Sequence, residues 1–221
     1  MTRISDNRKR PAQSGDATSM VVFLHGYGAD GADLLGLAEP LAPHMPDTVF
    51  YAPNAPEVCA TNPSGFQWFP IPWIDGSSEE AAEQSMAQSV VDLNAYLDAA
   101  MEEEGLRPEE VILFGFSQGT MMSLHVAPRR EDPVAAIVAF SGRLLQPESL
   151  EDEVKSKPPI LLVHGDQDDL VPIQSMGEAG DKLTEQEFEV YAHVMEGTGH
   201  GIAPDGLNVA LAFMRDKLQL D

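Results

Sequence analysis

Ser117 lies at the centre of residues 115–119, which read G-F-S-Q-G and fit the pattern G-x-S-x-G. The apolar run 111–114 precedes this motif directly, and residues 120–124 can open a helix after it. At a tight strand-to-helix turn, a serine is held in a strained backbone conformation with its hydroxyl exposed, and small flanking residues let the backbones approach. The pattern therefore predicts that Ser117 is a nucleophile.

A serine hydroxyl is a weak nucleophile near neutral pH, so it needs a base, and a carboxylate must orient that base. In hydrolases built on this turn, the acid follows the serine in the sequence and the histidine comes last. One predicted strand leads into Asp166, Asp168 and Asp169, and a later one leads into His200, which has glycine on both sides. Open α/β sheets place their sites at such strand ends. We predict His200 as the base, while spacing alone leaves the three aspartates open.

Acyl transfer also needs hydrogen-bond donors for the oxygen that becomes negative in the transition state. The backbone N–H of Gln118, directly after the serine, is one such donor. Residues 23–28 read F-L-H-G-Y-G and form a glycine-rich loop after an early apolar run. We predict that the backbone N–H of Tyr27 in this loop is the second donor. The glycines match neither G-x-G-x-x-G nor a Walker loop with its lysine, so phosphate binding is not predicted.

Four motifs in this order resemble the phospholipase/carboxylesterase family of small α/β-hydrolases, which includes bacterial carboxylesterases and acyl-protein thioesterases. The motifs are residues 23–28, residues 115–119, residues 164–168 (H-G-D-Q-D) with Val171-Pro172, and Gly199-His200. The resemblance extends from about residue 20 to the C-terminus. It implies an α/β-hydrolase fold with no separate cap domain.

The resemblance also assigns roles. It implies Ser117 as nucleophile, His200 as base and Asp168 as the acid, because the family places Val-Pro three residues after its acid. It implies the backbone N–H groups of Tyr27 and Gln118 as the oxyanion hole. Asp169 departs from the family pattern, which often has proline at this position.

Short apolar runs alternate with helical patterns along the chain. The runs predict strands at 20–24, 48–52, 111–114, 135–140, 160–164 and 189–194, and the patterns predict helices near 32–42, 79–104, 118–127, 173–184 and 207–218. Several runs are apolar almost throughout, which is typical of strands covered on both faces. Ser77 and Glu80 have capping-box spacing at the start of one helix. The alternation predicts an α/β fold, with a mostly parallel central sheet and helices on both faces.

Residues 53–78 interrupt this alternation with five prolines among several aromatic side chains. Prolines disfavour regular helix and central strand, so we expect an ordered loop that packs over the sheet edge. Long ordered loops often line substrate pockets. We therefore predict an acyl pocket whose wall is the aromatic loop 66–74, with further apolar residues elsewhere. The candidate substrate-binding residues are Phe66, Trp68, Leu144, Leu170 and Ile173.

The composition excludes several classes of partner. With 13 Lys and Arg against 36 Asp and Glu, the formal net charge is −23, and such a surface repels nucleic acid and anionic lipid. No apolar run approaches the length of a membrane span, so no membrane insertion is expected. Cys59 is the single cysteine, which rules out an intramolecular disulfide and a cysteine-based metal site. The aspartates 166, 168 and 169 lack the glycine and bidentate glutamate of an EF-hand, so we predict no metal and no cofactor.

Residues 1–19 are polar, carry Arg8-Lys9-Arg10 and lack the apolar stretch of a signal peptide. We expect them to form a flexible N-terminal tail before a single α/β-hydrolase domain at residues 20–221. A cytoplasmic location is the corresponding expectation.

The predicted function is that of a serine carboxylesterase acting on small esters with short to medium acyl chains. An acyl thioesterase or lysophospholipase with the same triad is the alternative, because only the leaving group or the alcohol differs. A non-catalytic binding protein on the same fold is a third possibility, although such proteins usually lack a triad member. The oligomeric state stays open between monomer and homodimer.

Overall fold

The computed structural model describes residues 2–4 and 8–220. Within this part of the chain, the main sheet has the strand order β1-β3-β2-β6-β7-β8-β9. All neighbouring strands are parallel except β1, which pairs antiparallel with β3. The strands are β1 Lys9–Arg10, β2 Ser19–Leu24, β3 Thr48–Tyr51, β6 Val111–Phe116, β7 Ala136–Phe140, β8 Ile160–Gly165 and β9 Val190–Met195.

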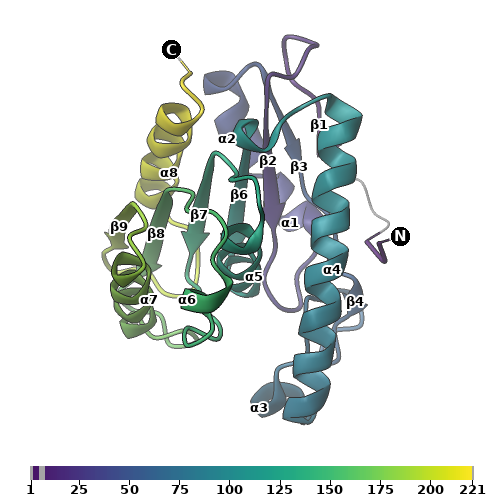
Figure 1. The fold of residues 1–221 in the computed structure, drawn as a ribbon, viewed down its shortest axis with the longest axis vertical. Coiled ribbons are helices and arrows are strands. Elements are labelled where there is room, and N and C mark those ends of the chain that lie inside the picture. The colour runs from purple at the N-terminus through teal and green to yellow at the C-terminus, as the bar shows by residue number, and fades with distance from the viewer. Residues whose placement is uncertain (1, 5–7, 221) are drawn as a thin grey trace.

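Helices cover both faces of this sheet (Figure 1). One face carries α1 Gly31–Leu35, α2 Ala38–Leu41 and α8 Pro204–Lys217, and the other carries α4 Glu79–Glu104, α5 Gln118–Val126, α6 Leu150–Glu153 and α7 Gln174–Glu185. Short 3₁₀ turns span Ala42–His44, Pro108–Glu110 and Ala127–Arg129. The mostly parallel sheet between two helical layers is the predicted fold class, which is thereby confirmed.

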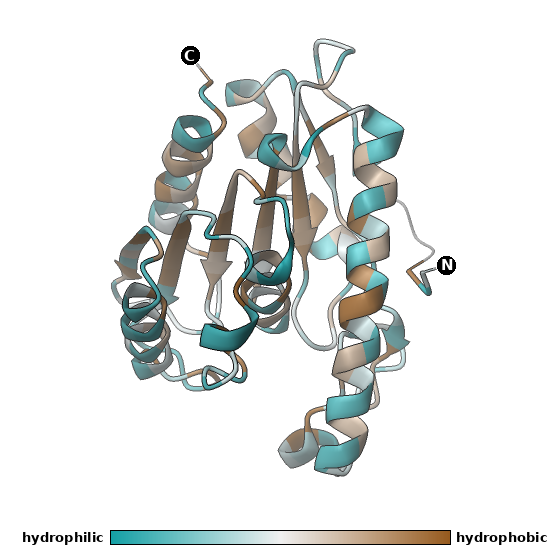
Figure 2. Cartoon of the chain, viewed as in Figure 1, coloured by the Kyte–Doolittle hydropathy of each residue, from teal (hydrophilic) through white to brown (hydrophobic). Residues whose placement is uncertain are grey.

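The sheet has a separate hydrophobic core on each face because side chains alternate along a strand. On β2, Val21 and Phe23 pack into the core that includes Leu41 and Phe213, while Val22 faces the core of α4 and α5. Both cores are buried, so the central strands are apolar throughout. Figure 2 accordingly shows brown strands between helices in which teal and brown segments alternate.

The structure corrects two details of the predicted helices. The expected helix at 32–42 is divided into α1 and α2, with Gly36 as the C-cap of α1. The helix α4 begins and ends where the pattern predicted, but its N-cap is Ser78 rather than Ser77. The Ser78 side chain accepts a hydrogen bond from the Ala81 N–H at 3.1 Å, so the capping box proposed for Ser77 and Glu80 is wrong.

The proline-rich segment 53–78 contains a small two-stranded sheet, β4 Glu57–Val58 with β5 Phe66–Gln67, and the short helix α3 Pro72–Asp75. In Figure 1, α3 lies at the lower end of the molecule, toward which the arrowheads of the parallel strands point. The segment is therefore an ordered loop at the carboxyl edge of the sheet, where the candidate catalytic residues were expected.

Of the predicted flexible tail at residues 1–19, the described residues 2–4 and 8–19 pack against the domain, while residues 1 and 5–7 lie outside the described part of the chain. Lys9 and Arg10 form β1 and close the edge of the sheet beside β3. The Lys9 ammonium lies 2.6 Å from the Glu103 carboxylate, and Arg3 pairs with Asp92 at 2.7 Å. Two interactions favour this arrangement. The backbone of Lys9 and Arg10 pairs with the free edge of β3, and basic side chains of the segment form ion pairs with nearby carboxylates. No helix among the described residues is long and apolar enough to cross a membrane.

Candidate active site

Ser117 occupies a strained turn between β6 and α5. Its backbone angles are φ 54° and ψ −114°, a conformation that non-glycine residues rarely adopt. Glycines make the turn possible: a Cβ at Gly119 would lie 1.8 Å from the carbonyl oxygen of Leu24. A Cβ at Gly115 would likewise lie 2.4 Å from the Thr120 nitrogen. The G-x-S-x-G spacing is thus needed for close backbone packing around the serine.

The loop after β9 brings His200 onto Ser117. Its Nε2 lies 2.9 Å from Ser117 Oγ, and its Nδ1 lies 2.7 Å from Asp168 Oδ2. The ring of Phe116 lies beside the imidazole, with 4.9 Å between ring centroids. Since the Asp168 carboxylate accepts from Nδ1, Nε2 is left free to accept the serine proton. The structure therefore brings the three residues predicted for a triad into one hydrogen-bonded chain.

The Asp168 carboxylate is buried and fixed by its own loop. Its Oδ1 accepts hydrogen bonds from the N–H groups of Leu170 and Val171 at 2.9 and 2.8 Å. His164 Nε2 lies 3.3 Å from Oδ2 and 2.8 Å from the carbonyl oxygen of Val171. Burial would raise the pKa of Asp168, but the hydrogen bonds from His200, Val171 and Leu170 outweigh it and hold this pKa below its usual value. The carboxylate is therefore ionised at neutral pH.

The three aspartates that spacing could not separate have different positions. Asp168 contacts His200. Asp166 Oδ1 instead accepts a hydrogen bond from the Gly197 N–H at 2.7 Å, and this bond joins the loop after β8 to the loop after β9 that carries His200. Asp169 lines the catalytic cavity described below. The two loops approach closely because Gly165 has no side chain: a Cβ there would lie 2.2 Å from the carbonyl oxygen of Thr198.

The loop after β2 packs directly against Ser117. A Cβ at Gly26 would lie 3.2 Å from the Ser117 Cβ, so this position favours glycine. Among the described residues, no protein group accepts a hydrogen bond from the backbone N–H of Tyr27 or Gln118. Two N–H groups beside a candidate nucleophile are therefore available to an external oxygen.

The His25 side chain fixes the backbone of the loop after β2. It is fully buried, and burial lowers the pKa of its imidazole, so the ring is neutral. Nε2 accepts from the Ala55 N–H at 2.9 Å, which leaves Nδ1 to donate to the Gly26 carbonyl oxygen at 2.8 Å. The indole N–H of Trp68 donates to the His25 carbonyl oxygen at 2.9 Å. These bonds fix the backbone on which Tyr27 lies.

The side chain of Gln118 has a role that the sequence did not suggest. Its Oε1 accepts from the Trp68 N–H at 2.9 Å, and its Nε2 donates to the Phe69 carbonyl oxygen at 2.7 Å. The residue after the serine thus ties the aromatic loop to the serine turn. Trp68 is fully buried by this arrangement.

Ser117 and His200 line a cavity of about 450 Å³. Of the predicted substrate-binding residues, Leu170 lines this cavity, and the two predicted oxyanion-hole residues, Tyr27 and Gln118, line it as well. Phe66, Trp68, Leu144 and Ile173 are not among its lining residues. Trp68 lies in the hydrophobic core, Phe66 packs against that core, and Leu144 lines a neighbouring cavity. These four side chains therefore lie outside the lining of the catalytic cavity.

Within the predicted wall segment 66–74, the residues that line the cavity are Ile71, Trp73 and Ile74. Trp73 and Ile74 of α3 are 70% and 50% exposed and lie at the cavity, as Leu170 does at 75%. Ile71, Phe116, Met121 and Val171 complete the apolar lining. The composition of this loop indicates an apolar wall, but which of its aromatic side chains face inward depends on contacts with distant residues, such as the bond from the Trp68 N–H to Gln118. Within the described residues, no three His, Cys, Asp or Glu side chains cluster as a metal site would require.

A model of the phospholipase/carboxylesterase family matches residues 11–218. This chain belongs to that family. Its structure superimposes on the crystal structure of esterase PE8 with a TM-score of 0.91 and 45% identity, covering 96% of this chain and 98% of the other. The α/β-hydrolase fold implied by the four motifs is thereby confirmed.

Relatives in this family carry both esterase and thioesterase names. The chain is 29% identical to acyl-protein thioesterase 1 of Saccharomyces cerevisiae, over 91% of this chain and 94% of that protein. It is 24% identical to esterase YpfH of Escherichia coli, over 90% of this chain and 83% of that protein. The serine-hydrolase family is therefore established, and its members' names point to hydrolysis of esters and thioesters.

Proposed function

We propose that this family member is a carboxylesterase that hydrolyses carboxylic esters with short to medium acyl chains through an acyl-enzyme on Ser117. The observation that carries the proposal is the continuous hydrogen-bonded chain from Ser117 Oγ through His200 to Asp168, with distances of 2.9 and 2.7 Å. A serine needs such a base to act as a nucleophile near neutral pH.

In the first half of the reaction, Ser117 Oγ attacks the ester carbonyl carbon while His200 Nε2 accepts its proton. His200 then gives this proton to the departing alcohol, and the acyl group stays on the serine. Asp168 holds the imidazole in the correct tautomer and stabilises the imidazolium. In the second half, His200 takes a proton from water, the resulting hydroxide attacks the acyl carbon, and Ser117 leaves with the proton returned.

The negative oxygen of each tetrahedral intermediate would lie against the backbone N–H groups of Tyr27 and Gln118. Their lack of protein acceptors and the close approach of Gly26 to Ser117 support this role. Loss of one such donor costs on the order of 10²–10³ in rate in other hydrolases. The anchoring of this loop by His25 and Trp68 would keep both donors in place before substrate binds.

The apolar cavity beside Ser117 supports a substrate with a modest acyl chain. Its volume of about 450 Å³ falls within the range of small-molecule sites. The wall formed by Ile71, Trp73 and Ile74 would contact the acyl chain.

Hydrolysis of thioesters is a second candidate, and the acyl-protein thioesterases among the relatives favour it. The triad would act in the same way, since only the leaving group changes from an alcohol to a thiol. The net charge of −23 argues against polyanionic acyl-CoA as the substrate, because like charges repel. Rates on oxygen and sulfur esters of the same acyl chain would distinguish the two.

The test is a series of p-nitrophenyl esters from acetate to palmitate, measured for the wild type and for Ser117→Ala. We expect kcat/KM to be highest at short or medium chains and to fall by more than about 10⁴-fold in the variant. Wild-type hydrolysis retained by Ser117→Ala would overturn the mechanism. Labelling of Ser117 by a fluorophosphonate, with no ester hydrolysed, would favour a thioester substrate instead.

A further inference from the structure

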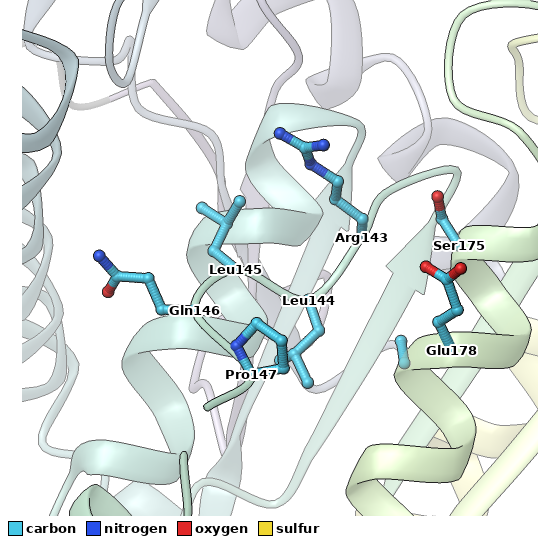
Figure 3. Close-up of a pocket in the computed structure, with 8 residues that line it drawn as sticks. Arg143, Leu144, Leu145, Gln146, Pro147, Ser175 and Glu178 are labelled. Carbon is cyan, nitrogen blue, oxygen red and sulfur yellow. The ribbon is translucent and has the colours of Figure 1, made fainter. Parts of the chain in front are cut away.

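Arg143 lies in the loop after β7, between two cavities outside the catalytic one. The first, of about 310 Å³, lies between residues 143–147 and the helix α7 (Figure 3). The second, of about 150 Å³, is shared by this loop, the segment with α3 and the start of α4. Arg143 borders both cavities, and nothing in the proposed mechanism uses it.

Arg143 differs from most other cations of this acidic chain. Among the described residues, it has neither a carboxylate oxygen within 4.0 Å nor a protein acceptor for its N–H groups. Carboxylate partners within that distance are found for Arg3, Arg8, Lys9, Arg107, Arg129, Arg130, Lys155, Lys157, Lys182 and Lys217. Figure 3 shows its guanidinium extending away from α7 and thus from Glu178, the acidic residue of the first cavity. Its hydrogen-bonding edge is therefore available to a ligand.

The guanidinium is also connected to the catalytic cavity. Its central carbon lies 5.2 Å from the centre of the Trp73 ring, and Trp73 lines both the second cavity and the catalytic cavity. The preceding residue passes close to the nucleophile, since a Cβ at Gly142 would lie 2.9 Å from the Ser117 carbonyl oxygen. A cation–π contact with an aromatic ring uses none of the N–H donors of a guanidinium, so these stay available to a ligand. The Trp73 side chain therefore lies between the Arg143 guanidinium and the catalytic cavity.

We propose that Arg143 binds a free carboxylate carried by the acyl part of the substrate, so that monoesters of dicarboxylic acids are preferred substrates. This inference rests on the proposed esterase function and adds the class of acyl group. A planar guanidinium pairs with a carboxylate through two parallel hydrogen bonds, and the cation–π contact with Trp73 holds the guanidinium beside the catalytic cavity. The acyl chain would lie along Trp73, between Ser117 and Arg143.

A carboxylate fits this place better than a phosphate does. Glu178 borders the first cavity, Glu79 and Glu83 border the second, and Asp169 lines the catalytic cavity. A doubly charged phosphate would be repelled by these groups about twice as strongly as a singly charged carboxylate. One guanidinium balances one negative charge, so the monoanion is the ligand that its charge and fork geometry match.

The test compares two esters of the same length, monoethyl adipate and the ethyl ester of adipamic acid, whose terminal amide is neutral. The measured quantity is the ratio of kcat/KM for the carboxylate ester to kcat/KM for the amide ester. We expect Arg143→Ala and Arg143→Gln to lower this ratio by about tenfold relative to the wild type, since a charge-assisted bidentate pair is lost. Arg143→Lys keeps the charge without the fork and should give an intermediate ratio.

Lys157→Ala is the matched control, because it removes one positive charge at a surface pair with Glu187. Its ratio should equal that of the wild type, which separates a local contact from a change in net charge. Equal ratios in the wild type and in both Arg143→Ala and Arg143→Gln would overturn the inference while leaving the esterase proposal intact. A wild type that hydrolyses neither ester, with Ser117 unreactive to a fluorophosphonate, would overturn the proposed function and this inference with it.

Discussion

Three aspartates within four residues illustrate how finely this site depends on single positions. Asp168 holds His200, Asp166 holds the backbone of Gly197, and Asp169 lines the cavity. All three carry the same functional group, and spacing alone could not rank them; only the resemblance to the family pointed to Asp168. Their roles differ because the N–H groups of Leu170 and Val171 fix only the Asp168 carboxylate toward the histidine.

Replacing Asp168 by asparagine should lower kcat by about 10⁴-fold, because an amide that donates to Nδ1 forces the wrong tautomer on His200. Asp166→Asn and Asp169→Asn are matched controls that remove the same charge a short distance away. Each should lower kcat by less than about tenfold, since neither contacts the imidazole. Steady-state kinetics on one p-nitrophenyl ester checks all three, and equal losses in the three variants would contradict the assignment.

His125 in α5 makes the stability of the fold sensitive to acid. It is buried, its Nδ1 has no hydrogen-bond partner among the described residues, and Arg129 lies nearby. Burial, reinforced by the charge of Arg129 and only partly offset by Glu153, lowers the pKa of His125 to about 4. In the unfolded chain its pKa is about 6.5, so the unfolded state binds more protons between these values. This contribution to stability is therefore complete above about pH 6.5 and is lost as the pH falls toward 4.

The prediction is that His125→Gln loses less stability than the wild type between pH 7.5 and pH 5.0. The difference in the free energy of unfolding should be roughly 1–2 kcal/mol, after allowance for partial solvent screening. Urea unfolding at the two pH values measures it. Parallel losses in the two proteins would show that His125 does not control the acid response.

At the scale of elements, hydrophobic periodicity and the order of the motifs were enough to predict the central strands and the long helix α4. The central strands are apolar on both faces, and α4 begins and ends as its pattern indicated. Strand β1 was missed because two residues, Lys9 and Arg10, carry no apolar pattern and are positioned by the edge of β3. The inward turn of Trp68 was missed for a similar reason. It depends on a hydrogen bond from its backbone to Gln118, fifty residues away in the sequence.

The two tryptophans of the segment 53–78 should therefore respond differently to substitution. Trp73→Ala removes an exposed ring from the wall of the catalytic cavity, so we expect the profile of kcat/KM against acyl length to shift toward longer chains. The ester series from acetate to palmitate measures this shift. An unchanged profile would mean that α3 does not limit the acyl chain.

Trp68→Ala should act mainly on stability. The ring is fully buried and its N–H is bonded to the His25 carbonyl oxygen, so its loss creates a cavity and leaves an acceptor without its partner. We expect a decrease of about 3–5 kcal/mol in the free energy of unfolding. Denaturant unfolding checks this value. A variant of wild-type stability with an altered chain-length profile would restore the acyl-wall role that the sequence suggested for Trp68.

At the scale of the whole molecule, the dominant feature is the surplus of acidic residues, 36 against 13 basic ones. Many of the basic side chains are engaged in ion pairs, including Lys155 with Glu131 and Lys157 with Glu187. Exposed pairs contribute little to stability, with a typical value of about 0–1 kcal/mol each. The unpaired carboxylates repel one another across the surface, and this repulsion destabilises the compact state at low ionic strength.

We therefore expect salt to stabilise this protein. The Debye length falls from about 30 Å at 0.01 M to about 3 Å at 1 M, so added NaCl screens the long-range repulsion among carboxylates. Between these concentrations Tm should rise by about 3 °C or more, which corresponds to ~1 kcal/mol for a chain of this size. Differential scanning calorimetry at fixed pH measures the change. A falling Tm would mean that the ion pairs outweigh the repulsion.

A charge variant separates screening from other effects of NaCl. Asp132 and Glu148 have no basic partner within 4.0 Å among the described residues, so the double variant Asp132→Asn/Glu148→Gln removes repulsion without breaking a pair. At low salt it should melt above the wild type, because two of the repelling charges are gone. At 1 M NaCl the two melting temperatures should converge, since the remaining repulsion is screened in both proteins. A gap in Tm that stays constant with salt would place the effect in local packing rather than in the field of the whole molecule.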